Sequence, residues 1–212
     1  MSKKCSVLHD LAHSSLRLSF RDDFSRLPED GIYLLFEHGE SGHGGDRIVR
    51  VGSHTGDKQL QPRLRQHFLV ENKDRSIFRK NIGRAILSAS GDPFLADWEL
   101  DLTTRKARQL HEERIDTEKK MAIEQQVSRC IQDKFSFVVI PQPDPRVRLS
   151  LETKMISTVA GCDICSSSET WLGRQSPTVK IRERGLWQVM GLDKEPLSDQ
   201  ELEGLTGQFW TG

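Results

Sequence analysis

The feature that most constrains this chain is a pair of short apolar runs separated by a glycine-rich loop. The first run, GIYLLFE, covers residues 31–37, and the second, RIVRVG, covers residues 47–52. Most of the sequence between them, HGESGHGGD, consists of Gly, Ser and Asp, which favour turns. Two such runs flanking a turn-forming loop predict a pair of antiparallel strands.

Helical patterns follow this predicted hairpin. Pro62 marks a first helical position, and Leu64 and Phe68 then lie one turn apart. A second helix is predicted to begin with Ser76 as its cap and to end before residues 91–93. Later elements are expected as a long charged helix near 112–134, a buried strand at 135–140, a helix at 148–160 and a short helix that starts with a capping box at 198–201.

These elements predict an α/β fold with a small three-stranded antiparallel sheet flanked by helices. A chain of 212 residues with 35% apolar content is long enough to bury a core of its own. We expect the following organisation: an N-terminal extension at 1–27, the main domain at 28–175 with a charged helical insertion near 92–134, and a C-terminal extension at 176–212 packed on the same domain.

The charge of the chain is unevenly distributed. The net charge is zero, which argues against a general nucleic-acid coat protein or a polybasic membrane binder. Residues 47–84 nevertheless contain ten Lys and Arg against three acidic residues. This segment has two interpretations: a solvated, charged helical face, or a surface that faces phosphate groups.

The sequence predicts no membrane segment. It contains no run of roughly 18 apolar residues, and its first residues lack the apolar stretch of a secretory signal. The four cysteines, Cys5, Cys130, Cys162 and Cys165, are few and scattered, which fits a reducing compartment. We therefore expect a cytoplasmic protein without a membrane partner.

Cys162 and Cys165 form a CxxC pair, which is compatible with half of a zinc site or with a redox pair. No second CxxC follows it, and neither Cys5 nor Cys130 is placed by sequence to complete a metal site. We expect two ordinary cysteines near a helix end. Three histidines in polar loops are expected to be solvated rather than metal ligands: His38, His43 and His54.

Four residues, Tyr33, Arg63, His67 and Glu152, stand out by their position and chemistry. Tyr33, the only tyrosine, lies in the first strand, and Arg63 and His67 are four residues apart and so share a helix face. Taken singly, Tyr33 could be a strand tyrosine with a backbone partner, and His67 a capped or solvated helix residue. Glu152 lies at the edge of an apolar stripe, where a carboxylate is costly unless it is paired, for example with Arg148, or binds a metal.

The order of these motifs resembles the GIY-YIG nuclease superfamily over roughly residues 28–175. GIY stands at 31–33, a degenerate form of YIG, RVG, stands at 50–52, and the R-x-x-x-H-F motif runs from 63 to 68. Glu152, in LETKMIS, follows the third predicted strand at the position of the metal-binding Glu of the family. Each motif is weak alone, and their order and spacing make the match specific.

The resemblance implies a DNA endonuclease that hydrolyses phosphodiester bonds with one Mg²⁺ or Mn²⁺ per site. Glu152 would bind the metal, and Arg63 would stabilise the charge that develops on the phosphate. Tyr33 and His67 both remain candidates for aligning and deprotonating the attacking water. The basic segment would line the groove for duplex DNA, with these expected contacts: Arg50, Ser53, His54, Arg65, Arg79, Lys80 and Arg84.

Three departures from the family pattern support an alternative function. Arg50 stands where the second tyrosine is usual, Ser53 stands where a lysine often follows, and SSSETWLG has no clear counterpart of the late asparagine. The alternative is a catalytically impaired module that binds nucleic acid on the same scaffold. A protein-interaction domain without DNA affinity is disfavoured by the clustered positive charge.

Overall fold

The computed structural model describes residues 1–111 and 113–212. The strands are β1 (Gly31–Gly42), β2 (Gly45–Gly52) and β3 (Phe135–Pro141). The helices are α1 (Ser2–His13), α2 (Leu60–Phe68), α3 (Ile77–Ala89), α4 (Leu95–Trp98), α5 (Arg105–His111), α6 (Thr117–Lys134), α7 (Pro145–Ala160), α8 (Val179–Arg184) and α9 (Asp199–Gly204). Short 3₁₀ turns are η1 (Phe24–Arg26), η2 (Lys73–Arg75) and η3 (Leu172–Gln175).

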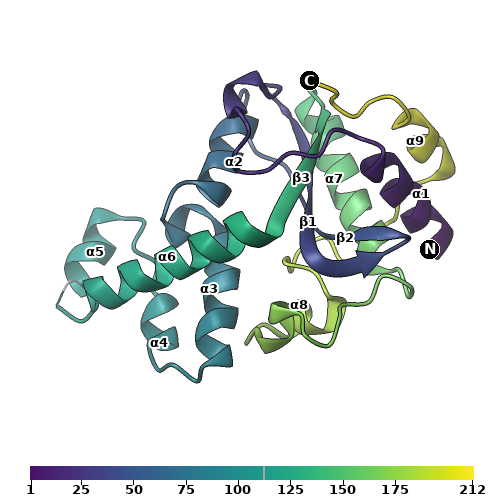
Figure 1. Cartoon of the computed structure of the whole chain (residues 1–212). Coiled ribbons are helices and arrows are strands. Elements are labelled where there is room, and N and C mark those ends of the chain that lie inside the picture. Colours follow the sequence, from purple (N-terminus) through teal and green to yellow (C-terminus); the bar gives the residue numbers. More distant parts are fainter. Residues whose placement is uncertain (112) are drawn as a thin grey trace.

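The three strands form one antiparallel sheet in the order β2-β1-β3, which confirms the predicted fold class (Figure 1). Strand β1, which carries the GIY triplet, is therefore the central strand. Tyr33 lies opposite Gly52 in β2 and opposite Val139 in β3. All three residues of the GIY triplet thus pair with β3, and Tyr33 is also paired with β2.

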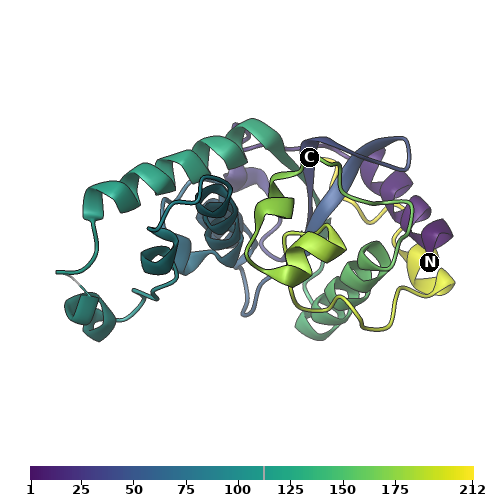
Figure 2. The ribbon, with the colours of Figure 1, turned by 90° about the horizontal axis from the view of Figure 1, so that it is seen from below.

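Alternate side chains of β1 enter two separate apolar layers. Tyr33 and Leu35 pack with residues of α2, α3 and α6, whereas Ile32, Leu34 and Phe36 pack with residues of α1, α7 and α9. Figures 1 and 2 show these two groups of helices on opposite sides of the sheet. Because successive side chains of a strand point to opposite faces, burial of both faces requires the unbroken apolar run that the sequence shows.

Several sequence-based boundaries agree with the structure. The side chain of Ser76 caps α3 by accepting a hydrogen bond from the backbone N–H of Arg79 at 3.2 Å. Ser198 and Glu201 form the predicted capping box at the start of α9. Both caps satisfy backbone donors that a helix start leaves without partners.

Other boundaries differ from the prediction. Strand β1 extends to Gly42, α2 begins at Leu60, and α7 begins at Pro145, where Asp144 caps the helix and proline is tolerated in the first turn. Helix α6 begins at Thr117, and residue 112, the predicted start, lies outside the described residues. The sequence did not predict four helices: α1, α4, α5 and α8.

Glu37, near the end of the paired part of β1, binds the segment that follows α7 to the sheet. Its Oε2 accepts the indole N–H groups of Trp171 at 2.9 Å and Trp187 at 2.8 Å. Burial raises the pKa of the Glu37 carboxyl, and the two indole donors act in the opposite direction. The predicted boundary near 175 therefore crosses a shared interior, since Trp171 and Trp187 belong to one apolar cluster.

Helices α3 and α6 are joined by a buried ion pair. Arg79 Nη2 lies 2.9 Å from Glu124 Oε2, and it also donates to Ser128 Oγ at 2.8 Å. Both charged side chains are essentially excluded from solvent.

Helices α4 and α5 and the first turns of α6 project away from the sheet, as both views show (Figures 1 and 2). Among the described residues, no helix has both the length and the apolar character needed to cross a membrane.

We expect Glu124→Ala to lower the free energy of unfolding by about 3 to 5 kcal/mol, because it leaves the Arg79 guanidinium buried without its counter-charge. Urea denaturation at neutral pH measures this loss. The matched control is the double variant Arg79→Met with Glu124→Leu, which removes both charges and should recover most of the stability. A loss below about 1 kcal/mol for Glu124→Ala would contradict this role of the ion pair.

Candidate active site

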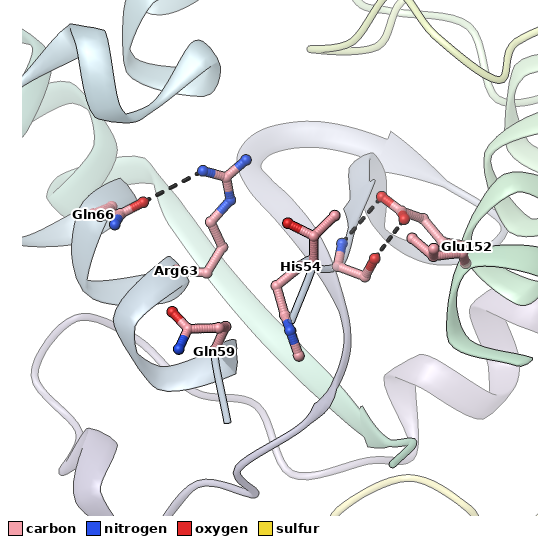
Figure 3. Close-up of a pocket in the computed structure, with 8 residues that line it drawn as sticks. His54, Gln59, Arg63, Gln66 and Glu152 are labelled. Carbon is pink, nitrogen blue, oxygen red and sulfur yellow. Dashed lines mark hydrogen bonds between the residues drawn. The ribbon is translucent and has the colours of Figure 1, made fainter. Parts of the chain in front are cut away.

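A surface pocket of about 370 Å³ lies between the C-terminal end of β2, helix α2 and helix α7. Figure 3 shows Arg63 and Gln66 on one wall, Glu152 on the opposite wall, and His54 between them. Residues 63 and 152, which were predicted from motifs far apart in the sequence, therefore face one common space. The pocket is lined by Ser53, His54, Thr55, Gln59, Arg63, Gln66, Leu149 and Glu152.

The carboxylate of Glu152 is fixed by the residue that follows β2. The backbone N–H of Ser53 donates to Oε1 at 3.0 Å, and its hydroxyl donates to Oε2 at 2.5 Å (Figure 3). Two hydrogen bonds from one residue, one to each carboxylate oxygen, fix the orientation of this side chain. Strand β2 and helix α7 are thus connected at the pocket through the predicted metal ligand.

Arg148 does not pair with Glu152, which was the alternative explanation for this acidic residue. The Arg148 guanidinium is fully buried and donates instead to three backbone carbonyls, those of Gly56, Gln142 and Pro143. It also lies 3.8 Å from the carboxylate of Asp30. Glu152 consequently remains directed toward Ser53 and the pocket.

Arg63, on α2, carries a positive charge without an acidic partner among residues 1–111 and 113–212. Its Nη1 donates to Gln66 Oε1 at 3.3 Å and to the carbonyl of Arg75 at 3.2 Å. Within the described residues its Nε–H has no hydrogen-bond partner, and no carboxylate lies within ion-pair distance. A guanidinium in this state offers donors and charge to an anion that enters the pocket.

Tyr33 and His67 form a buried hydrogen-bonded pair behind the pocket. Tyr33 Oη lies 2.7 Å from His67 Nε2, and His67 Nδ1 lies 2.7 Å from Ser76 Oγ. Neither Tyr33 nor His67 is exposed to solvent. Tyr33 thus has a side-chain partner rather than a backbone partner, and His67 is not a solvated helix residue.

Burial strongly lowers the pKa of His67, and the positive charges of Arg50, Arg63 and Arg79 lower it further. The imidazole is therefore neutral at physiological pH. A neutral ring carries one proton on its two nitrogens, so it donates one of the two hydrogen bonds to Tyr33 and Ser76 and accepts the other.

Comparison with protein families identifies this arrangement. A family described as the GIY-YIG domain matches residues 3–208. The chain belongs to the GIY-YIG family. No curated protein and no solved structure matches it significantly. The match confirms the resemblance and extends beyond 28–175 toward both ends of the chain.

Membership of the GIY-YIG family places the chain in a nuclease superfamily whose domains bind nucleic acid and commonly use a divalent metal ion.

The structure shows where the residues of the degenerate second motif, RVG, lie. Gly52 retains the family glycine, and a Cβ there would lie 2.3 Å from Tyr33 Oη. Arg50 turns into the interior, where its Nη1 donates to the carbonyl of Trp187.

The expected DNA contacts of this GIY-YIG chain fall into four groups. Ser53 and His54 line the pocket, and Arg65 is exposed on α2. Lys80 and Arg84 both lie near Glu99, with shortest distances of 3.7 and 2.6 Å to its carboxylate. The structure revises the roles of Arg50 and Arg79: these side chains are buried, and a buried guanidinium presents no donors to a phosphate at the surface.

His54 differs from the solvated loop residue that we expected. Its side chain is almost fully buried, its Nδ1 lies 3.2 Å from the carbonyl of Gly56, and its Nε2 accepts the backbone N–H of Gly31 at 3.2 Å. Burial lowers the pKa of the ring. The His54 ring thus connects the loop after β2 to the start of β1.

Sequence reasoning missed four participants of the site. Gln66 lies three residues after Arg63, so the helical repeat places both on one face. Ser76 was identified as a cap and also contacts His67. Gln59 and Thr55 line the pocket without any motif that would have signalled them. Ser168, near the expected late asparagine, instead bonds to Glu40 and does not line the pocket.

A second cluster of side chains lies away from this pocket. The potential ligand atoms of Cys5, His9, His43 and Cys165 lie within 4.8 Å of one another. Two expectations were therefore wrong. Cys5 lies in one cluster with Cys165, and His43 packs against other side chains instead of being a solvated loop residue. The sequence did not reveal the cluster because its members come from three separate segments.

The depressed pKa of His67 predicts a specific pH dependence of stability. Below about pH 6.5 the unfolded histidine binds a proton that the folded one does not, so the free energy of unfolding falls as pH decreases, by up to about 1.4 kcal/mol per pH unit. Above that pH this histidine contributes no slope. We expect His67→Gln to remove this contribution from the acid-side slope, which is the slope of the free energy of unfolding against pH below about pH 6.5. Urea denaturation at several pH values between about 5 and 8 measures this slope.

The control for this experiment is His38→Gln, which removes a histidine from an exposed position of β1. It accounts for the general effect of losing one histidine. Equal acid-side slopes in the wild type and in His67→Gln would contradict the assignment of a neutral His67 in the folded state.

Proposed function

We propose that this GIY-YIG protein is a divalent-metal-dependent endonuclease that hydrolyses phosphodiester bonds in duplex DNA. The observation that carries the proposal is the pair of opposite charges across one pocket. Arg63 lacks an acidic partner among the described residues, and Glu152 is held in a fixed orientation by Ser53. Phosphodiester hydrolysis requires such a combination, a cation for the phosphate and a hard oxygen ligand for a metal.

The donors around Glu152 fit Mg²⁺ or Mn²⁺. Glu152 supplies carboxylate oxygen, the ligand type that these hard cations prefer, and Mg²⁺ commonly keeps several waters while binding one or two carboxylates. A pocket of about 370 Å³ has room for a hydrated ion, since one water occupies about 30 Å³. When bound, the ion would supply positive charge to the phosphate and to the leaving oxygen. Ser53 would hold its ligand in place.

Positive charge that is free to bind phosphate gathers at helix α2. Within residues 47–84, six of the ten basic side chains lie within 4.0 Å of a carboxylate: Arg47, Lys58, Lys73, Arg79, Lys80 and Arg84. In the described part of the chain, the remaining four have no such partner, namely Arg50, Arg63, Arg65 and Arg75. Since Arg50 is buried, we assign the phosphate-binding surface to the other three.

Tyr33, rather than His67, is our choice for the group that aligns the attacking water. His67 is enclosed, and each of its ring nitrogens already has a partner. The three arginines that lower its pKa also disfavour a second positive charge on the ring, so it is a poor final acceptor for a proton. The oxygen of Tyr33 is placed against Gly52, next to the pocket residue Ser53. His67 then acts as a positioning residue for the phenol.

A second candidate function rests on the burial of the same pair. Tyr33 and His67 have no exposed surface, and neither lines the pocket. A domain in which the phenol never reaches water would bind nucleic acid through Arg63 and α2 without cleaving it. The two functions share a binding surface and differ in turnover, so a cleavage assay separates them.

We expect Arg63→Ala and Glu152→Gln each to lower Mg²⁺-dependent nicking of supercoiled plasmid by at least about 100-fold, because each removes a group that stabilises charge in the transition state. Gel analysis of nicked and supercoiled plasmid measures the rate. Circular dichroism checks that both variants remain folded.

Two exposed residues outside the pocket provide matched controls for this assay. Arg129→Ala on α6 removes one positive charge, and Glu203→Gln on α9 removes one negative charge. Both should nick at the wild-type rate. Nicking by Glu152→Gln at that rate would remove Glu152 from the site, and DNA binding without nicking by the wild type would favour the second candidate function.

DNA binding by the wild type should weaken steeply with salt, because each neutralised phosphate releases counterions. We expect Arg65→Ala to reduce the slope of log Kd against log salt concentration by about one. Arg84→Ala should change the slope less, since Glu99 already offsets its charge. Fluorescence anisotropy with labelled duplex DNA in the absence of divalent metal gives both values. Equal effects of the two substitutions would argue against a surface centred on α2.

A further inference from the structure

A cluster of two cysteines and two histidines lies beside the turn of the β1–β2 hairpin. Cys5 and His9 are one turn apart on α1, His43 is in the hairpin turn, and Cys165 follows α7. Cys5, His9 and Cys165 are buried, and His43 is partly buried. Figure 1 shows α1 next to the hairpin turn, which agrees with the contacts between α1 and β2.

Two distances within the cluster are close to those of ligands that share one metal ion, and all four potential ligand atoms lie within 4.8 Å of one another. The two sulfur atoms, of Cys5 and Cys165, lie 3.9 Å apart, and His9 Nε2 lies 3.7 Å from Cys165 Sγ. With Zn–S bonds of about 2.3 Å and Zn–N bonds of about 2.0 Å, tetrahedral geometry places two sulfur ligands roughly 3.8 Å apart and a nitrogen and a sulfur ligand roughly 3.6 Å apart. Small movements would therefore complete a tetrahedral site.

The backbone around the cluster is shaped for this close approach. A Cβ at Gly42 would lie 2.7 Å from Cys165 Sγ, so a glycine is required there. His43 has a φ of +52°, a left-handed conformation that is uncommon for residues other than glycine. Strained backbone of this kind is often found at functional sites.

His9 is oriented as metal-binding histidines commonly are. Its Nδ1 lies 2.9 Å from the carbonyl of Cys5, a contact that leaves Nε2 unprotonated when Nδ1 donates. Its Nε2 accepts the backbone N–H of Ile48 at 3.1 Å. A metal ion would take this lone pair in place of the amide.

We propose that Cys5, His9, His43 and Cys165 bind one structural Zn²⁺ ion. Two thiolates and two imidazoles are a common donor set for tetrahedral zinc, whereas Mg²⁺ prefers oxygen ligands. On binding, both thiols release their protons to solvent, and the two thiolates balance the charge of the ion. Four protein ligands leave no open position for water or substrate, so the site is structural.

The proposed zinc site and the nuclease pocket lie at opposite ends of β2. Seven residue steps separate Gly45, next to the cluster, from Gly52, next to the pocket, and steps of about 3.3 Å make this separation roughly 23 Å. The zinc would join α1, the hairpin turn and the segment after α7. It is therefore a different ion, with a different role, from the one proposed at Glu152.

The test is the zinc content of the whole chain, purified without a polyhistidine tag and without chelators. Mass spectrometry of the metal should give about one zinc per chain for the wild type and for Cys130→Ser, whose thiol lies outside the cluster. Cys5→Ser and Cys165→Ser should lose most of it. Equal zinc in all four proteins, or none in the wild type, would overturn the proposal.

Replacement of zinc by Co²⁺ in the wild type keeps the proposal testable if the cysteine variants fail to fold. Tetrahedral Co²⁺ bound to thiolates should give visible d–d bands and an ultraviolet sulfur-to-metal band. His43→Asn, which tolerates the left-handed turn, should weaken or shift these bands, and Cys162→Ser, whose sulfur lies 3.3 Å from His43 Nε2, should leave them unchanged. Stoichiometric Co²⁺ without such bands, or their loss in Cys162→Ser, would overturn the assignment of ligands.

Removal of zinc by a chelator should also lower the melting temperature of the wild type and leave that of Cys5→Ser unchanged. This measurement does not depend on DNA cleavage. A protein that contains zinc but does not nick DNA would contradict the proposed function only, and a zinc-free protein that nicks DNA would contradict the zinc site only.

Discussion

The burial of β1 on both faces is the constraint on which the rest of this structure depends. A central strand with apolar partners above and below cannot slip by one residue, because a slip would exchange the side chains of its two faces. Tyr33 is thereby held toward α2, where it meets His67, and Ile32 is held toward the opposite layer. Gly52 then has to be glycine, since its Cβ would overlap the phenol. This explains why the second motif keeps its glycine although Arg50 stands in place of its tyrosine.

Pairing of charges determines where the basic segment can act. By sequence, residues 47–84 carry a large positive excess. In the fold, acidic residues from distant segments offset most of it, as Glu124 does for Arg79 and Glu99 does for Arg84. Opposite charges within a few ångströms cancel at longer range, so the field that a DNA phosphate meets comes mainly from the arginines without such partners. These lie on and next to α2, beside the pocket. Burial lowers the pKa of His67 most, and one of these arginines, Arg63, lowers it further, which connects the binding surface to the chemistry behind it.

What the sequence could predict depended on the range of the interaction. The local composition of residues 31–37 and 47–52 predicts that they pair as strands, and Ser76 is a residue type that predicts a helix cap. The four-residue spacing of Arg63 and His67 indicates one helix face. The bond from Ser53 to Glu152 joins residues 99 positions apart, and no local pattern encodes it. The partner of Arg79 and the meeting of Cys5 with Cys165 are also products of tertiary packing. At the pocket, the order of the family motifs allowed residues far apart in the sequence to be assigned to one site. The family resemblance gave no prediction for the Cys/His cluster.

The hairpin itself explains why an anchor is needed far from the pocket. The pairing of β1 with β2 is irregular between Leu35 and Phe36 and again between Phe36 and Ser41. Such irregularities interrupt the ladder of hydrogen bonds, so the half of the hairpin near its turn is less firmly held than the half near Gly52. Side chains of α1 replace the missing bonds: His9 accepts from the amide of Ile48, and His13 bonds to the carbonyl of Asp46 at 2.8 Å. An ion that joins His9 to His43 would replace the bond from His9 to Ile48 and fix the turn end of β2, and through β2 it would limit the motion of Ser53 and therefore of Glu152.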